Sequence, residues 1–168
     1  ADAVMLSAES AAGAYPVEAV TMMARITAAA ELHIQTHPEA GLPELPVEPS
    51  IYHAVARSSV ALAETIEAKV IVAFSTSGNT AVRIARERPN IPFMVMTPYL
   101  AVQRRLALLW GTQTAPFALS ANFESAIGEA VTEAKAVGIA HQGDHMVVIA
   151  GMPFGVAGTT NSMRVVTL

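Results

Sequence analysis

Short apolar runs alternate with longer segments of helical spacing along most of this chain. Val70–Phe74 is a continuous apolar run, which is typical of a strand buried on both faces of a sheet. The same pattern predicts further strands at 93–96, 113–117, 146–150 and 163–167, and helices between them at about 79–88, 97–109 and 122–137. Because strands alternate with helices, the pattern predicts an α/β domain. It should have three αβα layers and a mostly parallel, roughly five-stranded sheet.

Two more helices are predicted before the first of these strands. Apolar residues recur at helical spacing from Pro16 to about residue 35, and a proline is tolerated in a first helical turn. Ser50 can cap a second helix that extends to about residue 67. The intervening residues 37–49 contain four prolines and three glutamates, which predicts a linker.

The first residues form a separate pattern. Val4-Met5-Leu6 is an apolar run followed by the polar residues 7–10, which predicts a strand and then a loop. Because a strand needs a hydrogen-bonding partner, we expect this one to pair with chain outside the sequence. The sequence is therefore expected to be the tail of a longer protein.

The composition excludes several classes of protein. Of the 168 residues, 52% are hydrophobic and 14% are charged, which excludes a disordered chain. The net charge of −4 gives no indication of a nucleic-acid partner, and no apolar run reaches the ~20 residues of a membrane span. The absence of cysteine excludes disulfides and thiolate catalysis, and it is consistent with a cytoplasmic protein.

The strongest candidate for chemistry is the polar loop after the first buried strand. The carboxyl end of such a strand, followed by a helix N-terminus, is where open α/β sheets bind ligands and where anions meet unpaired N–H groups. A glycine permits a tight turn here, and the hydroxyl groups add hydrogen-bond donors. The alternative is a capped turn without a ligand. The candidate phosphate-binding residues are Ser75, Thr76, Ser77, Gly78, Asn79 and Thr80.

The five histidines do not have the spacing of a metal site, so we expect no metal ligands among them. His33 and His37 fall at a helix end and in the linker, and His141 and His145 flank a turn. His53 is expected to be a surface residue in the first turn of its helix.

The first twenty residues also carry a family resemblance. Residues 2–10, followed by Gly13-x-Tyr15-Pro16-Val17-Glu18-Ala19-Val20, resemble the end of the catalytic barrel of pyruvate kinases. The family's usual Ser-Gly-Glu-Thr loop is Ser-Ala-Glu-Ser here, with the same spacing. The resemblance covers essentially the whole chain and is weakest at about 37–49. It implies that residues 1–36 are the last strand–helix unit of a (β/α)₈ barrel, 37–49 a linker, and 50–168 the C-terminal α/β regulatory domain.

The resemblance also implies a role for the polar loop. In pyruvate kinases the loop that matches 75–80 is the phosphate cradle of an allosteric effector site, and a second loop closes over the ligand. That second loop matches 151–161 here, with Gly155, Gly158, Thr159 and Thr160 as the candidate residues; without a ligand it would be an ordinary hairpin. Family members that use fructose bisphosphate carry Trp and Arg in this loop. This chain has no Trp there and no cation before Arg164, which favours a sugar monophosphate or AMP, or loss of the response.

For the whole protein, the resemblance implies phosphoryl transfer from phosphoenolpyruvate to ADP, giving pyruvate and ATP, with Mg²⁺ and K⁺. The catalytic and metal-binding residues would lie in earlier barrel strands. Glu9 is an acid near the expected barrel mouth, but we assign no catalytic residue to this chain and expect it alone to be inactive. A homo-oligomer, commonly a tetramer, is also implied, without a nucleic-acid or membrane partner. The alternative is a free-standing sugar-phosphate or nucleotide-binding α/β domain without enzyme activity.

Overall fold

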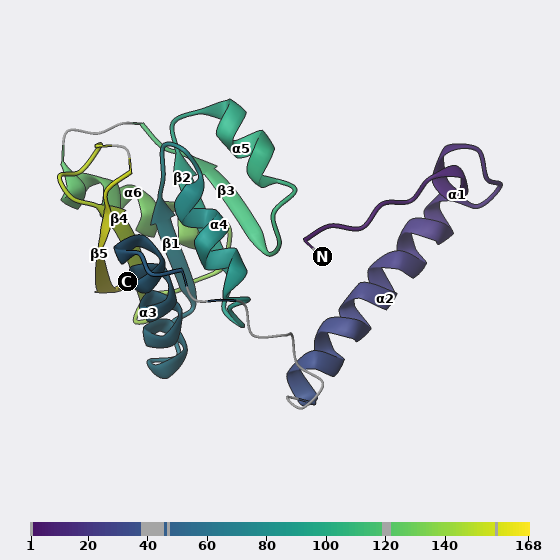
Figure 1. The fold of residues 1–168 in the computed structure, drawn as a ribbon, viewed down its shortest axis with the longest axis horizontal. Coiled ribbons are helices and arrows are strands. Elements are labelled where there is room, and N and C mark those ends of the chain that lie inside the picture. The colour runs from purple at the N-terminus through teal and green to yellow at the C-terminus, as the bar shows by residue number, and fades with distance from the viewer. Residues whose placement is uncertain (1, 38–45, 47, 119–121, 157) are drawn as a thin grey trace. The chain divides into compact units, whose positions relative to one another are not determined.

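The computed structural model describes residues 2–37, 46, 48–118, 122–156 and 158–168 (Figure 1). The chain divides into two compact units, one formed by Val4–Val47 and the other by Glu48–Leu168 with the first three residues. Within the described ranges, no helix combines the length and the apolar character needed to cross a bilayer.

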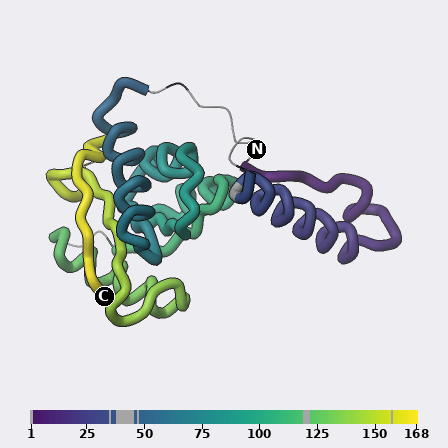
Figure 2. The backbone as a smooth tube through the Cα atoms, turned by 90° about the horizontal axis from the view of Figure 1, so that it is seen from below, coloured from purple at the N-terminus to yellow at the C-terminus, as the bar shows by residue number. Residues whose placement is uncertain are grey.

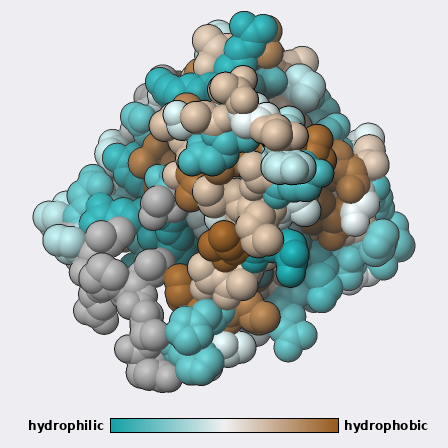
Figure 3. All heavy atoms as spheres, turned by 90° about the vertical axis from the view of Figure 1, so that its right-hand side faces the viewer, coloured by the Kyte–Doolittle hydropathy of each residue, from teal (hydrophilic) through white to brown (hydrophobic). Residues whose placement is uncertain are grey.

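The unit of residues 4–47 contains α1 (Ala8–Ala11) and the long helix α2 (Pro16–Thr36). Pro16 stands at the start of α2, as predicted. Many apolar side chains of this unit are exposed, and brown and tan residues stand among polar ones on the side seen in Figure 3. The exposed apolar residues are Val4, Met5, Tyr15, Val17, Val20, Met22, Ile26, Leu32 and Ile34.

The strand predicted at Val4-Met5-Leu6 stays a prediction, because the partner expected for it is not part of this sequence. These residues have no regular secondary structure, and no described strand pairs with them, so they lack the ladder that a strand requires. Residues 8–10 of the predicted loop instead belong to α1, and the Ser7 N–H donates to Glu9 Oε2 at 3.0 Å.

The larger unit is built on a five-stranded sheet with the order β3-β2-β1-β4-β5. Its strands are β1 (Val70–Phe74), β2 (Phe93–Thr97), β3 (Thr112–Pro116), β4 (His145–Gly151) and β5 (Thr160–Thr167). The first four pair in parallel, whereas β5 is antiparallel to β4 because a short hairpin connection joins them. The prediction of a mostly parallel sheet is confirmed.

Helices cover both faces of this sheet. The helices α3 (Ile51–Thr65), α4 (Asn79–Arg86) and α5 (Leu100–Leu106) share one core with Ile71 and Ala73 of β1. Alternate residues of the same strand, Val70, Val72 and Phe74, pack on the other face with α6 (Phe123–Ala136). Figure 2 shows the dark-blue α3 beside the yellow β5, which it contacts. The three predicted layers are therefore present.

The start of α3 contains one confirmed prediction and one error. The Ser50 hydroxyl caps the helix by accepting the His53 N–H at 3.2 Å. His53 was expected at the surface, yet only 3% of it is exposed. Its position continues the inward stripe of Ala56, Val60 and Ala63 at spacings of three and four, so its ring turns toward α4 rather than toward solvent.

Candidate functional site

The topology of the sheet places two loops side by side at its carboxyl edge. From β1 the chain crosses over to β2, while β4 pairs with the other side of β1. The order of the strands therefore reverses between β1 and β4, and this is the point at which open α/β sheets form a crevice outside the strand ends. The loop after β1 begins at Ser75, and the loop after β4 begins at Met152.

These two loops line a common cavity of about 160 Å³. That is roughly ten times the space that one ordered water requires, so the cavity can hold a small anionic group and part of its carrier. Nine of the ten predicted binding residues line it: Ser75, Thr76, Ser77, Asn79, Thr80, Gly155, Gly158, Thr159 and Thr160. Residue 157 of the second loop lies outside the described residues.

A hydrogen bond joins the two loops at the base of the cavity. Thr80 Oγ1 lies 2.7 Å from Thr160 Oγ1, and either hydroxyl can be the donor. The two residues are 3% and 8% exposed. Thr80 stands in the first turn of α4 and Thr160 begins β5, so this bond fixes the start of the helix against the end of the second loop.

Gly78, the tenth predicted residue, shapes the loop without lining the cavity. Its φ of +81° is left-handed, and its N–H donates to Ser75 Oγ at 2.9 Å. A Cβ at this position would lie 3.0 Å from Nη2 of Arg105 and 3.2 Å from Leu106 of α5. A glycine is therefore needed here for its conformation and for its close packing, and its N–H is engaged within the turn.

Arg83 brings a cation to the cavity, which the sequence-based reasoning missed. It lies on α4 three residues after Thr80 and lines the cavity. Its Nε is buried and has no hydrogen-bond partner in the described structure, and its guanidinium lies 5.4 Å from the centre of the Tyr52 ring. The spacing of three residues from Thr80 is a signal for one helix face that was present in the sequence.

Three phenylalanines give the cavity an apolar side. Phe74 ends β1, Phe117 follows β3, and Phe154 belongs to the second loop; all three line the cavity. The centre of the Phe74 ring lies 5.0 Å from the centre of the Phe117 ring and 5.4 Å from that of the Phe154 ring. A ligand held here would therefore meet polar groups at the start of α4 and aromatic rings opposite them.

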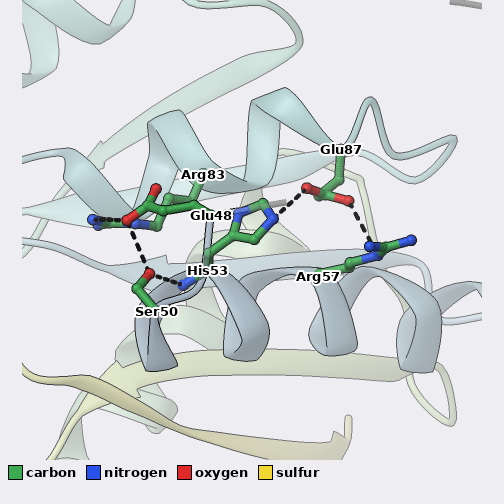
Figure 4. A network of polar contacts seen from close by, with 6 residues as sticks. All are labelled: Glu48, Ser50, His53, Arg57, Arg83 and Glu87. Atoms are coloured by element: carbon green, nitrogen blue, oxygen red, sulfur yellow. Dashed lines mark hydrogen bonds and ion pairs between the residues drawn. The ribbon is translucent and has the colours of Figure 1, made fainter. Parts of the chain in front are cut away.

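Glu48 forms a polar network with the cavity's cation (Figure 4). Its Oε1 accepts the Ser50 hydroxyl at 2.9 Å and lies 3.7 Å from Nη2 of Arg83. The hydrogen bond from Ser50 and, to a smaller extent, the charge of Arg83 lower the pKa of the Glu48 carboxyl. Next to this pair, Glu87 Oε1 lies 3.6 Å from His53 Nε2. Glu48 therefore remains ionised beside Arg83 near neutral pH.

Two other charged residues singled out from the sequence do not line the cavity. Glu9 belongs to the unit of residues 4–47. Arg164 forms an ion pair with Glu124. Across the described ranges, His, Asp and Glu side chains form no group of three or more that could hold a metal ion.

Comparison with known proteins identifies the family of this chain. Residues 53–166 match the family model described as pyruvate kinase, alpha/beta domain. A pyruvate kinase of Agrobacterium vitis is 43% identical over 98% of this chain and 35% of its own length. A pyruvate kinase of Methylorubrum extorquens is 35% identical over 98% of this chain and 34% of its own length. A solved pyruvate kinase structure from Cryptosporidium parvum superposes with a TM-score of 0.78 at 29% identity, covering 98% of this chain and 32% of its own. The chain thus spans about a third of these relatives' length.

Proposed function

The chain belongs to the pyruvate kinase family, and from that premise we propose that its α/β domain binds a phosphorylated metabolite in the cavity between residues 75–80 and 151–160. The observation that carries the proposal is that both loops, the first turn of α4 and the guanidinium of Arg83, further along the same helix, line one cavity. The first N–H groups of a helix have no partner within the helix, and they form its positive end. The hydroxyls of Ser77 and Thr76 and the guanidinium of Arg83 supply the other donors that a phosphate requires.

The charges around the cavity favour a single phosphate. Arg83 is the only Lys or Arg among the described residues that line it. A second phosphate would need a second cation, and Arg164 is paired with Glu124 instead. We therefore assign the site to a sugar monophosphate or AMP rather than to fructose bisphosphate. The apolar rings of Phe74, Phe117 and Phe154 would pack against the part of the ligand that carries the phosphate.

For the whole protein we propose the glycolytic reaction that transfers a phosphoryl group from phosphoenolpyruvate to ADP. Ligand binding in the α/β domain would regulate this reaction. We expect the Mg²⁺ and K⁺ implied by the family to be held by earlier barrel strands and not by these residues, so we derive no step through either ion. We further propose that these 168 residues alone catalyse no turnover, and a coupled assay that detects turnover would contradict this.

Assembly into a homo-oligomer, such as a tetramer, is part of the same proposal. β5 is at the edge of the sheet, with no described strand on its outer side, and Met163 and Val165 on it are 45% and 43% exposed. An exposed apolar edge of this kind is suited to pairing with another chain. Light scattering on the full-length protein tests this point, and a monomeric mass would contradict it.

A panel of phosphorylated metabolites tests the ligand site directly. Glucose 6-phosphate, ribose 5-phosphate and AMP should raise the thermal unfolding midpoint of the chain, because a ligand that binds only the folded state stabilises it. Ser77→Ala should weaken binding by about 1 kcal/mol or more through the loss of a hydrogen bond to charge. Ser58→Ala on the exposed side of α3 is the matched control. A turn without a ligand would respond to none of these compounds.

A further inference from the structure

The cation of the cavity already has an anionic partner from the same chain. Arg83 lines the cavity, and its Nη2 lies 3.7 Å from Glu48 Oε1. Glu48 does not line the cavity, so its carboxylate approaches the guanidinium from outside. Figure 4 shows Glu48 between Arg83 and Ser50, beside the first turn of α3.

Glu48 is held in this position by the cap of α3. The Ser50 hydroxyl donates to the same Oε1 atom that faces Arg83, while Ser50 Oγ accepts the His53 N–H. The carboxylate is therefore anchored by a residue that has a second structural role. The contact of Glu48 with Arg83 is less constrained. Its distance of 3.7 Å exceeds that of a hydrogen-bonded ion pair, and 43% of the Glu48 side chain is exposed.

Arg83 keeps part of its hydrogen-bonding capacity unused in this arrangement. Among the described residues its buried Nε has no hydrogen-bond partner, and 23% of its side chain is exposed. A guanidinium has five N–H donors and binds phosphate best through two of them at once. A phosphate in the cavity would offer Arg83 stronger hydrogen bonds than the distant carboxylate does.

We propose that Glu48 is a built-in competitor for Arg83 and that a phosphate entering the cavity displaces it. This inference rests on the proposed function, since it concerns the same cavity. Glu48 raises the concentration of phosphorylated ligand needed to fill the site, because the contact between its carboxylate and Arg83 must break before the phosphate can bind the guanidinium. Glu48 is also the first residue of the continuous segment 48–168 of the larger unit. Ligand binding would therefore change the contact between Glu48 and Arg83 at the start of this segment.

The test is a titration of the chain with glucose 6-phosphate, with inorganic phosphate as the minimal anion, at constant ionic strength. Constant ionic strength matters because salt screens exposed charges. Glu48→Gln removes the competing charge and should tighten binding about two- to fivefold, the range expected for an exposed ion pair. Arg83→Gln should weaken binding about tenfold or more, because it removes a charged donor to the phosphate.

Two control variants make the same charge changes elsewhere. Glu124→Gln and Arg164→Gln each break the ion pair between α6 and β5, and neither residue lines the cavity. Both should leave the affinity unchanged. The double variant Glu48→Gln/Arg83→Gln should bind no better than Arg83→Gln alone, because Glu48 acts only through Arg83.

The outcomes separate this inference from the proposed function. If the wild-type chain binds the probes and Arg83→Gln weakens binding, but Glu48→Gln changes nothing, the competitor is disproved and the phosphate site stands. If Glu48→Gln and Glu124→Gln tighten binding equally, or if Glu48→Gln tightens binding in the Arg83→Gln background, the change comes from net charge alone. Either result would also disprove competition by Glu48 for Arg83. If the wild-type chain binds neither probe, both proposals fail.

Discussion

Thr80 Oγ1 and Thr160 Oγ1 lie 2.7 Å apart, although 80 residues separate them in the sequence. One hydroxyl belongs to the first turn of α4 and the other to the start of β5. Both side chains are buried, and within the described ranges each hydroxyl has the other as its hydrogen-bond partner. This contact, together with the packing of Phe154 on Phe74, joins the two loops that form the candidate site.

Breaking this contact on one side should destabilise the domain. Thr80→Val keeps the shape of the side chain but leaves the Thr160 hydroxyl without its partner, so we expect the free energy of unfolding to fall by about 1–3 kcal/mol. Thr80→Val/Thr160→Val removes both polar groups and should recover part of this loss. Urea unfolding of the two single variants and the double variant measures the coupling, and strictly additive effects would show that the hydroxyls do not depend on each other.

The left-handed turn at Gly78 gives a second prediction. Gly78→Ala places a Cβ at a φ of +81° and within 3.0 Å of the Arg105 side chain, so it should lower stability by about 1–2 kcal/mol or more. Gly128→Ala in α6 is the matched control, because a Cβ there meets nothing within 4 Å and alanine favours the helix by up to about 1 kcal/mol. Thermal unfolding should therefore shift in opposite directions for the two variants. A neutral Gly78→Ala would contradict the turn described for this loop.

Phe154 should anchor the second loop. Its ring packs against Phe74 and, at 5.3 Å between centres, against Phe123. Phe154→Ala removes these contacts from a half-buried position and should cost about 2 kcal/mol of stability while weakening ligand binding. Val156→Ala in the same loop, where the side chain is 53% exposed, should change stability little. Equal stability of the two variants in urea would argue against an anchoring role.

The Glu48 carboxyl should make the free energy of unfolding depend on pH in the acid range. Its pKa in the folded chain is lowered below the ordinary 4.5, chiefly by the hydrogen bond from Ser50. The ionised group therefore stabilises the fold at pH values above about 4.5, and this contribution is lost as the pH falls through the lowered pKa. The stability difference between the wild-type chain and Glu48→Gln should shrink as the pH falls below about 4.5. Ser50→Ala should reduce the same pH dependence, and a constant difference across this range would refute the assignment.

Local patterns predicted most of the α/β domain, because they reflect burial and capping that act within a few residues. The apolar run of β1 was located to the residue, and Ser50 was identified as a cap from its side chain alone. The N-terminal run 4–6 has no regular secondary structure here, because pairing decides whether an extended segment is a strand and the partner expected for it is not in this sequence. His53 was misjudged because its polarity was given more weight than its place on the buried stripe of α3.

The candidate site was only partly accessible from the sequence. The residues of the 75–80 loop follow from their place between a buried strand and a helix, which is local information. The contact between Thr80 and Thr160 depends on the pairing of β4 beside β1, which no local pattern reveals. Arg83 was overlooked because the search for a cation was confined to the second loop, although helical spacing places it beside Thr80.

The most direct test of the phosphate site is a map of backbone amide chemical shifts during titration with glucose 6-phosphate. We predict saturable shifts centred on Ser77–Ala81 at the start of α4, with smaller ones at Thr159 and Thr160, because the phosphate would take hydrogen bonds from the first N–H groups of this helix. Absence of shifts up to the highest ligand concentration, or saturable shifts confined to another surface such as α6, would contradict the assignment of this cavity as the ligand site.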